Sequence, residues 1–245
     1  MKSTFLVGIA IQLFLFLAPA RASETGDALL RQIDTVALID NAHILLDVTV
    51  TDARGRTADR TIEVWQQGSE HRLVRILAPT RLRGIGLLVS PGDTVYLFLP
   101  EFPPARRVVG NKRSDAFMGT DFAIDDLARL TYADRYYAEV ASKNAENGLT
   151  ELALTPIDAK DGSHVKLWVA DDAVVRRVVH FNAKGDEIRI LELSDVRENA
   201  GALMAHTLTV TDVRRHRQTK ALIQKVESDV DLSPELFTVS NLERQ

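Results

Sequence analysis

The fold is decided by one alternating stretch near the start of the chain, Ile44-Leu45-Leu46-Asp47-Val48-Thr49-Val50-Thr51. Its aliphatic residues at 44, 46, 48 and 50 fall on one face of an extended chain, and the polar residues at 47, 49 and 51 fall on the other. Arg54-Gly55 then supplies a turn, and a second such stretch runs from Thr61 to Gln67. The pattern predicts two antiparallel strands that each bury one face.

The same period of two recurs along most of the chain. Short turn sequences separate the alternating stretches, among them Pro91-Gly92-Asp93, Asn147-Gly148 and Lys184-Gly185-Asp186. Further strands are predicted at Arg72–Leu77, Gly86–Val89, Thr94–Leu99, Leu152–Thr155, Val165–Ala170, Val174–Phe181, Ile188–Val196, Leu203–Val210 and Ala221–Val226. No segment has the pattern of a helix crossing between parallel strands. We therefore predict a mainly β fold built on one large antiparallel sheet.

Helix signals are few. Apolar residues at helical spacing between Ala28 and Leu38, preceded by Ser23, predict an N-terminal helix. Shorter helices are predicted at Asp121–Leu127 and Ser233–Phe237. A long antiparallel sheet cannot leave an apolar face in water, so either the sheet curls on itself or these helices cover its concave side.

The composition is that of a globular protein without cysteine chemistry. The chain has 245 residues, of which 45% are hydrophobic and 26% charged, and no cysteine. This excludes a disordered chain, a disulfide scaffold, a thiolate metal site and a cysteine nucleophile. No linker rich in Pro, Gly or Ser divides residues 23–245, so we expect a single domain there.

The first 22 residues have the pattern of a cleaved signal peptide. Lys2 gives a basic start, Phe5–Ala18 is an uncharged apolar run, and Ala20-Arg21-Ala22 is a small-x-small cleavage pattern before Ser23. A bilayer-spanning helix needs about 20 apolar residues, which is more than this run provides. We therefore expect a periplasmic protein with no permanent membrane anchor.

Charge is distributed unevenly along the sequence. The whole chain has a net charge of −4, which argues against nucleic acid as a partner. Residues 54–113 nevertheless carry 11 basic and 5 acidic side chains. In this region Arg81, Arg83, Arg106 and Arg107 are candidates to contact an anionic headgroup or an acidic partner. The favoured interpretation is that these charges protect a sheet edge against aggregation.

Motifs for catalysis, cofactors or metals are absent from the sequence. The six histidines form no close pair, and neither a G-x-S-x-G elbow nor a phosphate-binding loop occurs. Asp121, Asp125 and Asp126 could bind Ca²⁺ through oxygen atoms. The favoured interpretation is that they lie at the start of a helix, where acids interact well with its dipole and Asp121 can cap it. We expect no catalytic residue, cofactor or metal.

Several segments together resemble a known family. They are Leu82-Arg83-Gly84-Ile85-Gly86, Val95–Pro100, Phe117-Met118-Gly119-Thr120-Asp121-Phe122, Leu167-Trp168-Val169 and Pro234–Thr238. With them the chain resembles the outer-membrane lipoprotein-sorting family of LolA-like carriers, and within it an uncharacterised branch with a Phe-Met-Gly-Ser/Thr-Asp-Phe signature. The resemblance implies an unclosed half-barrel, a large curved antiparallel sheet with a few short helices covering its concave face.

The resemblance also implies a function. It is that of a monomeric, non-enzymatic periplasmic carrier that binds the acyl chains of a lipoprotein or lipid in an apolar cavity, for transfer towards the outer membrane. An inner-membrane transporter is a further expected partner. The alternatives are an adaptor of a membrane transporter and, less favoured, a hydrolase of lipid or glycan.

Six residues are candidates for the cavity or its lid. They are Phe117, Met118, Phe122, Leu127, Leu97 and Leu99. A polarizable Met between aromatic side chains suits a variable acyl chain. The favoured interpretation is nevertheless that Phe117, Met118 and Phe122 pack in the core and pin this segment to the sheet, as buried aromatic residues usually do.

Overall fold

The structure, a computed structural model, describes residues 21–128, 131–143, 146–157 and 162–244. The strands are β1 (Asn41–Thr51), β2 (Thr57–Gln67), β3 (His71–Ala78), β4 (Gly86–Ser90), β5 (Thr94–Phe98), β6 (Arg106–Val108), β7 (Tyr136–Ser142), β8 (Thr150–Pro156), β9 (His164–Val169), β10 (Val175–Phe181), β11 (Glu187–Asn199), β12 (Ala202–Asp212) and β13 (Arg217–Ser228). The helices are α1 (Arg21–Ala37), α2 (Ile124–Ala128) and α3 (Val239–Leu242), with short 3-10 helices η1 (Thr80–Leu82), η2 (Gly110–Ser114), η3 (Glu146–Gly148) and η4 (Pro234–Phe237).

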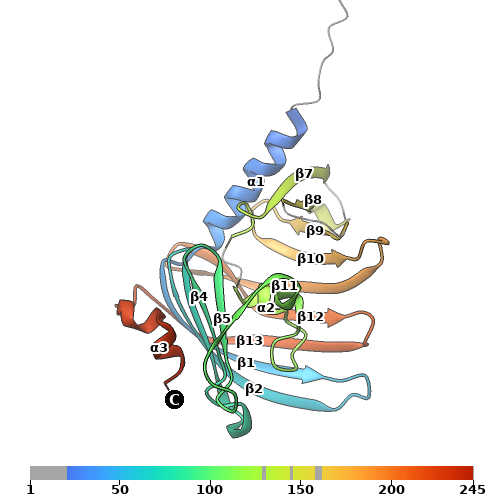
Figure 1. Cartoon of the computed structure of the whole chain (residues 1–245). Coiled ribbons are helices and arrows are strands. Elements are labelled where there is room, and N and C mark those ends of the chain that lie inside the picture. The colour runs from blue at the N-terminus through green and yellow to red at the C-terminus, as the bar shows by residue number, and fades with distance from the viewer. Residues whose placement is uncertain (1–20, 129–130, 144–145, 158–161, 245) are drawn as a thin grey trace, which may run out of the picture.

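All thirteen strands form one antiparallel sheet. Their order is β6-β5-β4-β3-β2-β1-β13-β12-β11-β10-β9-β8-β7. The chain therefore starts in the middle of the sheet, runs out to one edge at β6, reappears at the other edge as β7, and returns to the middle as β13. The curved sheet is not closed into a barrel, and the connection from β6 to β7, which contains η2 and α2, passes in front of it (Figure 1). The predicted fold class is confirmed.

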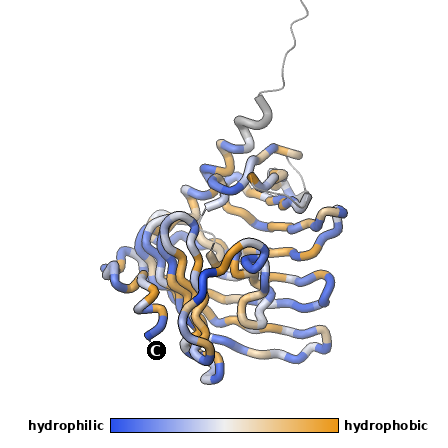
Figure 2. The backbone as a smooth tube through the Cα atoms, viewed as in Figure 1, coloured by the Kyte–Doolittle hydropathy of each residue, from blue (hydrophilic) through white to orange (hydrophobic). Residues whose placement is uncertain are grey.

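Period-two alternation produces the strands as predicted. Along β1 the side chains of Ile44, Val48 and Val50 are buried, and Asp47 between them is exposed. Hydrophobic and hydrophilic segments alternate along the strands in Figure 2. The concave face carries one large core cluster that includes Val74, Leu87 and residues of the connection before α2. The edge strands β6 and β7 were missed, because β6 has three residues and neither strand alternates clearly.

The N-terminal helix is confirmed, and it covers a sheet edge. Leu30 and Ile33 of α1 pack with buried residues of β7 to β10. The Asp27 carboxylate accepts a hydrogen bond from the Ala138 N–H of β7 at 2.8 Å. A Cβ built on Gly26 would lie 2.1 Å from the Ala138 carbonyl oxygen. Helix α1 thus lies against the β7 backbone at a distance that only glycine allows, and it shields this edge from other chains.

The C-terminal helix forms where expected but on the other face. Segment η4–α3 packs on the outer side of the sheet, where Phe237 and Leu242 meet Leu73 and Leu88. Those two leucines are next to Val74 and Leu87 in the sequence, so they point to the opposite face. Of the α-helices that the structure describes, α1 and α2 therefore cover the concave side. The continuous apolar run Leu87-Leu88-Val89 is typical of a strand with both faces buried.

The predicted signal peptide falls on residues 1–22, of which 1–20 lie outside the described residues. None of the helices that the structure describes is long and apolar enough to cross a membrane.

The contact of Gly26 with β7 can be tested by adding one methyl group. Alanine in place of glycine normally stabilises a helix interior by about 1 kcal/mol. We expect Gly26→Ala instead to lower the free energy of unfolding by about 2 kcal/mol, because the methyl group overlaps the Ala138 carbonyl. Urea unfolding measures this difference. A stabilised variant would show that α1 does not approach β7 this closely.

Candidate functional site

The candidate site is a cavity of about 310 Å³ on the concave side of the sheet. Aliphatic side chains of the central strands form its wall, among them Leu46, Val64, Leu208 and Ile223. Helix α1 contributes Ile33, Val36 and Ala37, and the connection before β7 contributes Phe117, Phe122 and Leu127. The wall therefore combines both halves of the sheet with the two helical segments that cover it.

The polar side chains in the wall are engaged within the protein. The Gln66 amide Nε2 donates to the Ile39 carbonyl oxygen at 3.0 Å, and the Thr120 hydroxyl donates to the Phe117 carbonyl oxygen at 2.7 Å. The Arg72 guanidinium donates to the Leu127 carbonyl oxygen at 2.9 Å and also to the Gln66 side chain. Burial lowers the pKa of Arg72 to about 10. These polar groups form hydrogen bonds with backbone or side-chain groups of the protein. The interior of the cavity therefore presents mainly apolar side chains, which suits an apolar ligand.

One side of the cavity is closed by a tight turn at Phe117–Phe122. Met118 and Gly119 occupy its two corners with φ angles of 46° and 74°, a pair of positive values that favours glycine at the second corner. The Phe117 N–H donates to the Phe122 carbonyl oxygen at 2.8 Å, and Ala116 pairs with Ala123. The turn therefore forms a small hairpin that places Phe117 and Phe122 side by side against the cavity.

Two arginines attach this turn to the sheet. Arg60 of β2 donates to the Met118 carbonyl oxygen at 3.1 Å, and Arg217 of β13 donates to the Gly119 carbonyl oxygen at 2.6 Å. Burial, and then the nearby charges of Arg81 and Arg217, lower the pKa of Arg60.

Asp121 has a different role from the one predicted. Its carboxylate, 2% exposed, accepts a hydrogen bond from the Thr219 hydroxyl at 2.7 Å and forms an ion pair with Arg217 at 3.4 Å. The Thr219 hydroxyl in turn accepts the Asp121 N–H at 2.8 Å. Asp121 therefore joins the turn to β13. The cap of α2 comes from Asp126, whose carboxylate accepts the Ala123 N–H at 2.8 Å.

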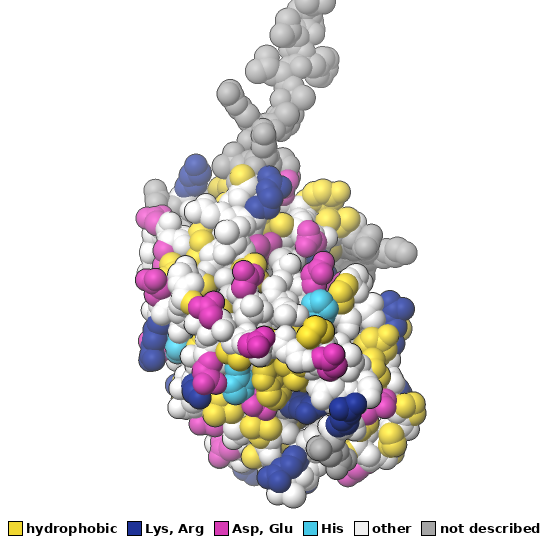
Figure 3. All heavy atoms as spheres, turned by 90° about the vertical axis from the view of Figure 1, so that its left-hand side faces the viewer, with side chains coloured by type: hydrophobic (Ala, Val, Ile, Leu, Met, Phe, Trp, Pro, Cys, Tyr) yellow, Lys and Arg dark blue, Asp and Glu magenta, His cyan; other side chains and the backbone are white. Residues whose placement is uncertain are grey.

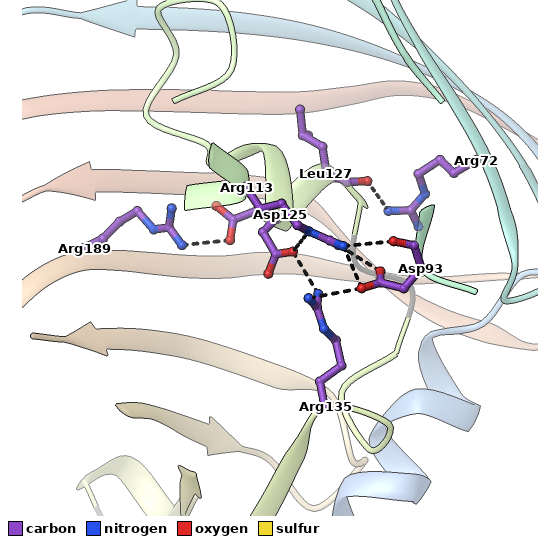
Figure 4. A network of polar contacts seen from close by, with 8 residues as sticks. Arg72, Asp93, Arg113, Asp125, Leu127, Arg135 and Arg189 are labelled. Atoms are coloured by element: carbon purple, nitrogen blue, oxygen red, sulfur yellow. Dashed lines mark hydrogen bonds and ion pairs between the residues drawn. The ribbon is translucent and has the colours of Figure 1, made fainter. Parts of the chain in front are cut away.

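Helix α2 is held at the cavity by ion pairs (Figure 4). Asp125 contacts Arg113 and Arg135 at 2.8 Å each, and Arg113 also reaches Asp93 of the β4–β5 turn at 2.6 Å. Burial acts to lower the pKa of Arg113, but its hydrogen bonds and charge interactions with the two aspartates raise it overall. On the other side Asp126 pairs with Arg189 of β11 at 2.9 Å.

The predicted lid and cavity residues divide into two groups. Phe117, Phe122 and Leu127 line the cavity, and Phe117 is fully buried. Leu97, Leu99 and Met118 pack against the adjoining core cluster and are not among the lining residues. Phe117 and Phe122 therefore both pack in the core cluster and line the cavity. Their contact with a ligand stays a prediction.

The four predicted arginines lie elsewhere. Arg81 and Arg83 are exposed at η1 and just after it, and Arg106 and Arg107 are exposed on β6. None of them is among the described residues that line the cavity. They lie at one end of the strands and, if they bind a headgroup, do so outside the cavity.

Sequence reasoning missed the polar residues that attach the Phe117–Phe122 turn to the sheet. Arg60 precedes Ile62 and Val64 by two and four positions, and Thr219 precedes Ala221 in the same way. Each therefore occupies an inward position of an alternating strand. A polar residue at an inward position could have indicated such an attachment, because a buried polar side chain requires a hydrogen-bonding partner.

The site has little of what catalysis or metal binding requires. Among the described residues, no three His, Asp or Glu side chains lie close enough to hold a metal ion. Of the described side chains in the cavity wall, Asp126 is the one carboxylate, and none is a histidine. Its arrangement suits the binding of apolar groups.

Comparisons with known proteins agree with this architecture. The model of a family described as "uncharacterized protein" matches residues 68–244. A domain from Vibrio parahaemolyticus, provisionally named for outer membrane lipoprotein sorting, has a TM-score of 0.81 at 18% identity, over 91% of this chain and 100% of that one. A DUF1329 family protein from Desulfovibrio piger has a TM-score of 0.83 at 20% identity, over 90% and 99%.

A LolA superfamily protein from Nitrosomonas europaea has a TM-score of 0.74 at 17% identity, over 89% of this chain and 98% of that one. No curated protein matches the sequence. At these identities the solved structures establish a shared fold.

The bond between Asp121 and Thr219 can be tested with an isosteric change. Thr219→Val removes both hydrogen bonds and leaves a buried carboxylate with less compensation. We expect a loss of about 3 kcal/mol in the free energy of unfolding. The control is Thr49→Val, which removes a similar bond to Asp59 at the surface and should cost less than about 0.5 kcal/mol. Equal losses in the two variants, measured by urea unfolding, would contradict this role.

Proposed function

The chain belongs to the family whose model matches residues 68–244. From the cavity and from the fold shared with the lipoprotein-sorting domain and the LolA superfamily protein, we propose that it is a periplasmic carrier of acyl chains. The ligand would be a lipid or the lipid part of a lipoprotein on its way towards the outer membrane. The proposal includes export through the signal peptide at residues 1–22, function as a monomer without cofactor or catalysis, and loading by an inner-membrane transporter.

The observation that carries the proposal is the apolar cavity. Its volume of about 310 Å³ is at the lower end of the range of small-molecule sites. Each methylene group moved from water into such a cavity gains about 0.8 kcal/mol. An acyl chain has many methylene groups and needs no specific polar partner along its length. The wall, with its polar side chains already engaged, satisfies both conditions.

The cover of the cavity would act as the lid. Helix α2 has five residues, which is too short to be stable without tertiary contacts. It is held by ion pairs whose side chains are 11% to 29% exposed, so solvent screens them only in part. A ligand must therefore bury several methylene groups, at about 0.8 kcal/mol each, to offset the loss of these contacts when the lid opens.

A cavity-filling variant tests the proposal. Leu208 lines the cavity, whereas Leu222 of the neighbouring strand lies on the outer face and is exposed. We expect Leu208→Trp to fill the cavity and to weaken the binding of a fluorescent fatty-acyl probe by at least about tenfold. Leu222→Trp is the matched control and should bind as the wild type does. The carrier proposal fails if the folded wild-type protein binds neither the probe nor any lipid detectable by mass spectrometry.

A second variant tests the lid. Asp125→Asn weakens the pairing of α2 with Arg113 and Arg135. We expect the probe to associate about fivefold faster in stopped-flow measurements, because the closed state loses about 1 kcal/mol. Asp195→Asn is the control, since it weakens the pair of Asp195 with Arg197 on β11, and neither residue lines the cavity. An unchanged association rate in Asp125→Asn would show that α2 does not control entry.

A further inference from the structure

The two ends of the strands carry opposite charge. One end is formed by the loops 52–56, 79–85, 99–107 and 212–217, which contain nine arginines and three acids. The arginines, here called the arginine rim, are Arg54, Arg56, Arg81, Arg83, Arg106, Arg107, Arg214, Arg215 and Arg217. One other described loop at this end, 182–186, has one lysine and one aspartate.

The opposite end is acidic. Its described loops 38–40, 68–70, 91–93, 170–174, 200–201 and 229–233 contain seven acids and neither lysine nor arginine. The same end also includes Lys112 and Arg113 after β6 and Lys143 after β7. Of these, Lys112 pairs with Asp115, and Arg113 pairs with Asp93 and Asp125. Figure 3 shows the side of the molecule that lies at the left of Figure 1, and there Asp and Glu side chains lie across the middle while most Lys and Arg side chains lie towards the margins. Such a separation of charge orients the whole molecule in an electric field.

The sheet topology brings the arginine rim together. Strands β13, β1, β2 and β3 are neighbours, so their loops 212–217, 52–56 and 79–85 are adjacent at one end. Figure 1 shows the β1–β2 and β12–β13 hairpins side by side. Arg81 of the third loop and Arg217 of the first both lower the pKa of Arg60, in agreement with this arrangement. Eight of the nine rim arginines are exposed, and Arg217 is half-buried.

Two of the three acids in these loops are already paired. Asp52 contacts Arg56 at 2.6 Å, and Asp212 contacts Arg215 at 3.6 Å. Glu101 is the third acid. The positive charge of the rim is therefore only partly neutralised by its own residues.

An exposed aromatic side chain lies in the same group of loops. Phe102 is 59% exposed in the β5–β6 loop, next to Pro103 and Pro104 and four residues before Arg106. None of the other exposed large hydrophobic residues that the structure describes lies in the four rim loops, and Val109 lies just after β6. The rim thus lacks the apolar centre that protein interfaces have, but it presents one phenyl ring among many guanidinium groups.

We propose that the arginine rim and Phe102 form a docking surface for membranes that contain anionic lipids. Guanidinium groups bind lipid phosphates in a bidentate manner, and the phenyl ring inserts at the boundary between headgroups and acyl chains. A bilayer supplies both partners over a broad flat area, which explains the spread of charge over four loops. The acidic opposite end is repelled, so the molecule docks with the rim towards the membrane.

This surface lies next to the cavity lid. Arg217 belongs to the rim and also holds Gly119 in the turn that closes the cavity. Docking therefore places the Phe117–Phe122 turn near the bilayer, where an acyl chain would enter or leave. The membrane proposal does not require that the cavity bind acyl chains, and the two are measured separately.

Vesicle sedimentation tests the charge requirement. The mature chain should bind phosphatidylcholine vesicles that contain phosphatidylglycerol, and bind pure phosphatidylcholine vesicles at least about tenfold more weakly. Arg54→Glu/Arg81→Glu/Arg214→Glu should weaken binding to the anionic vesicles by about 100-fold, since each basic residue near the surface contributes about fivefold. The fatty-acyl probe should bind this variant as it binds the wild type.

The matched control reverses three charges away from the rim, in Arg31→Glu/Lys143→Glu/Lys225→Glu. It changes the net charge equally and should keep most of the vesicle binding. Equal loss in both triple variants would overturn the proposal, because overall charge would then decide. Equal binding of the wild type to neutral and anionic vesicles would also overturn it, as would capture of an acidic protein by the rim without any vesicle binding.

A fluorescent label tests the role of Phe102. Because the chain has no cysteine, Phe102→Cys can be labelled at one position with an environment-sensitive dye. The emission should shift to the blue when anionic vesicles are added. Tyr137→Cys is the control, since Tyr137 is equally exposed at 59% but lies on β7. The same shift at both positions, or none at Phe102, would exclude insertion of this loop.

Discussion

The connection between β6 and β7 must join the two opposite edges of a thirteen-stranded sheet, and most other features depend on the route it takes. In the structure it crosses the concave side of the curved sheet, which is the shorter route between the two edges (Figure 1). A connection there lies over apolar side chains, so it must supply apolar residues of its own and satisfy its backbone groups away from water. The hairpin at Phe117–Phe122 meets both needs, because its N–H and carbonyl groups pair with each other and with side chains of β2 and β13.

The same segment combines two kinds of attachment. At the turn, a buried carboxylate and a threonine hydroxyl bond each other, and this contact depends on exact geometry more than on charge. At α2, three arginines whose side chains are 12% to 29% exposed pair with two aspartates, and these contacts depend on charge. The cover is therefore attached at the turn by a fully buried carboxylate and at α2 by charges that solvent still reaches in part. In the proposed carrier, α2 would separate while the turn keeps its register on the sheet.

Particular residues show which parts of the fold can be predicted from the sequence and which cannot. Strict alternation identified β1 and its neighbours, since each strand there buries one face. It did not identify β6, which is too short to show a period, or place α3, because a helix at the chain end can pack on either face. In the site, Phe117 and Phe122 were found from their local cluster. Arg60 and Thr219 were not found. Each bonds to the Phe117–Phe122 turn, which lies 58 residues from Arg60 and 98 residues from Thr219 in the sequence, and only the folded sheet brings them together.

The pairing of the first strand with the last has a consequence for how the molecule is made. β1 and β13 pair from Ala42–Ser228 to Thr51–Gln218, and both contribute to the wall of the cavity. Contacts between residues so distant in the chain form late in folding, because the loop between them must close first. A chain in which β13 has not yet joined the sheet has most of its strands but an incomplete cavity wall. The cavity is therefore completed when the final strand pairs with the first.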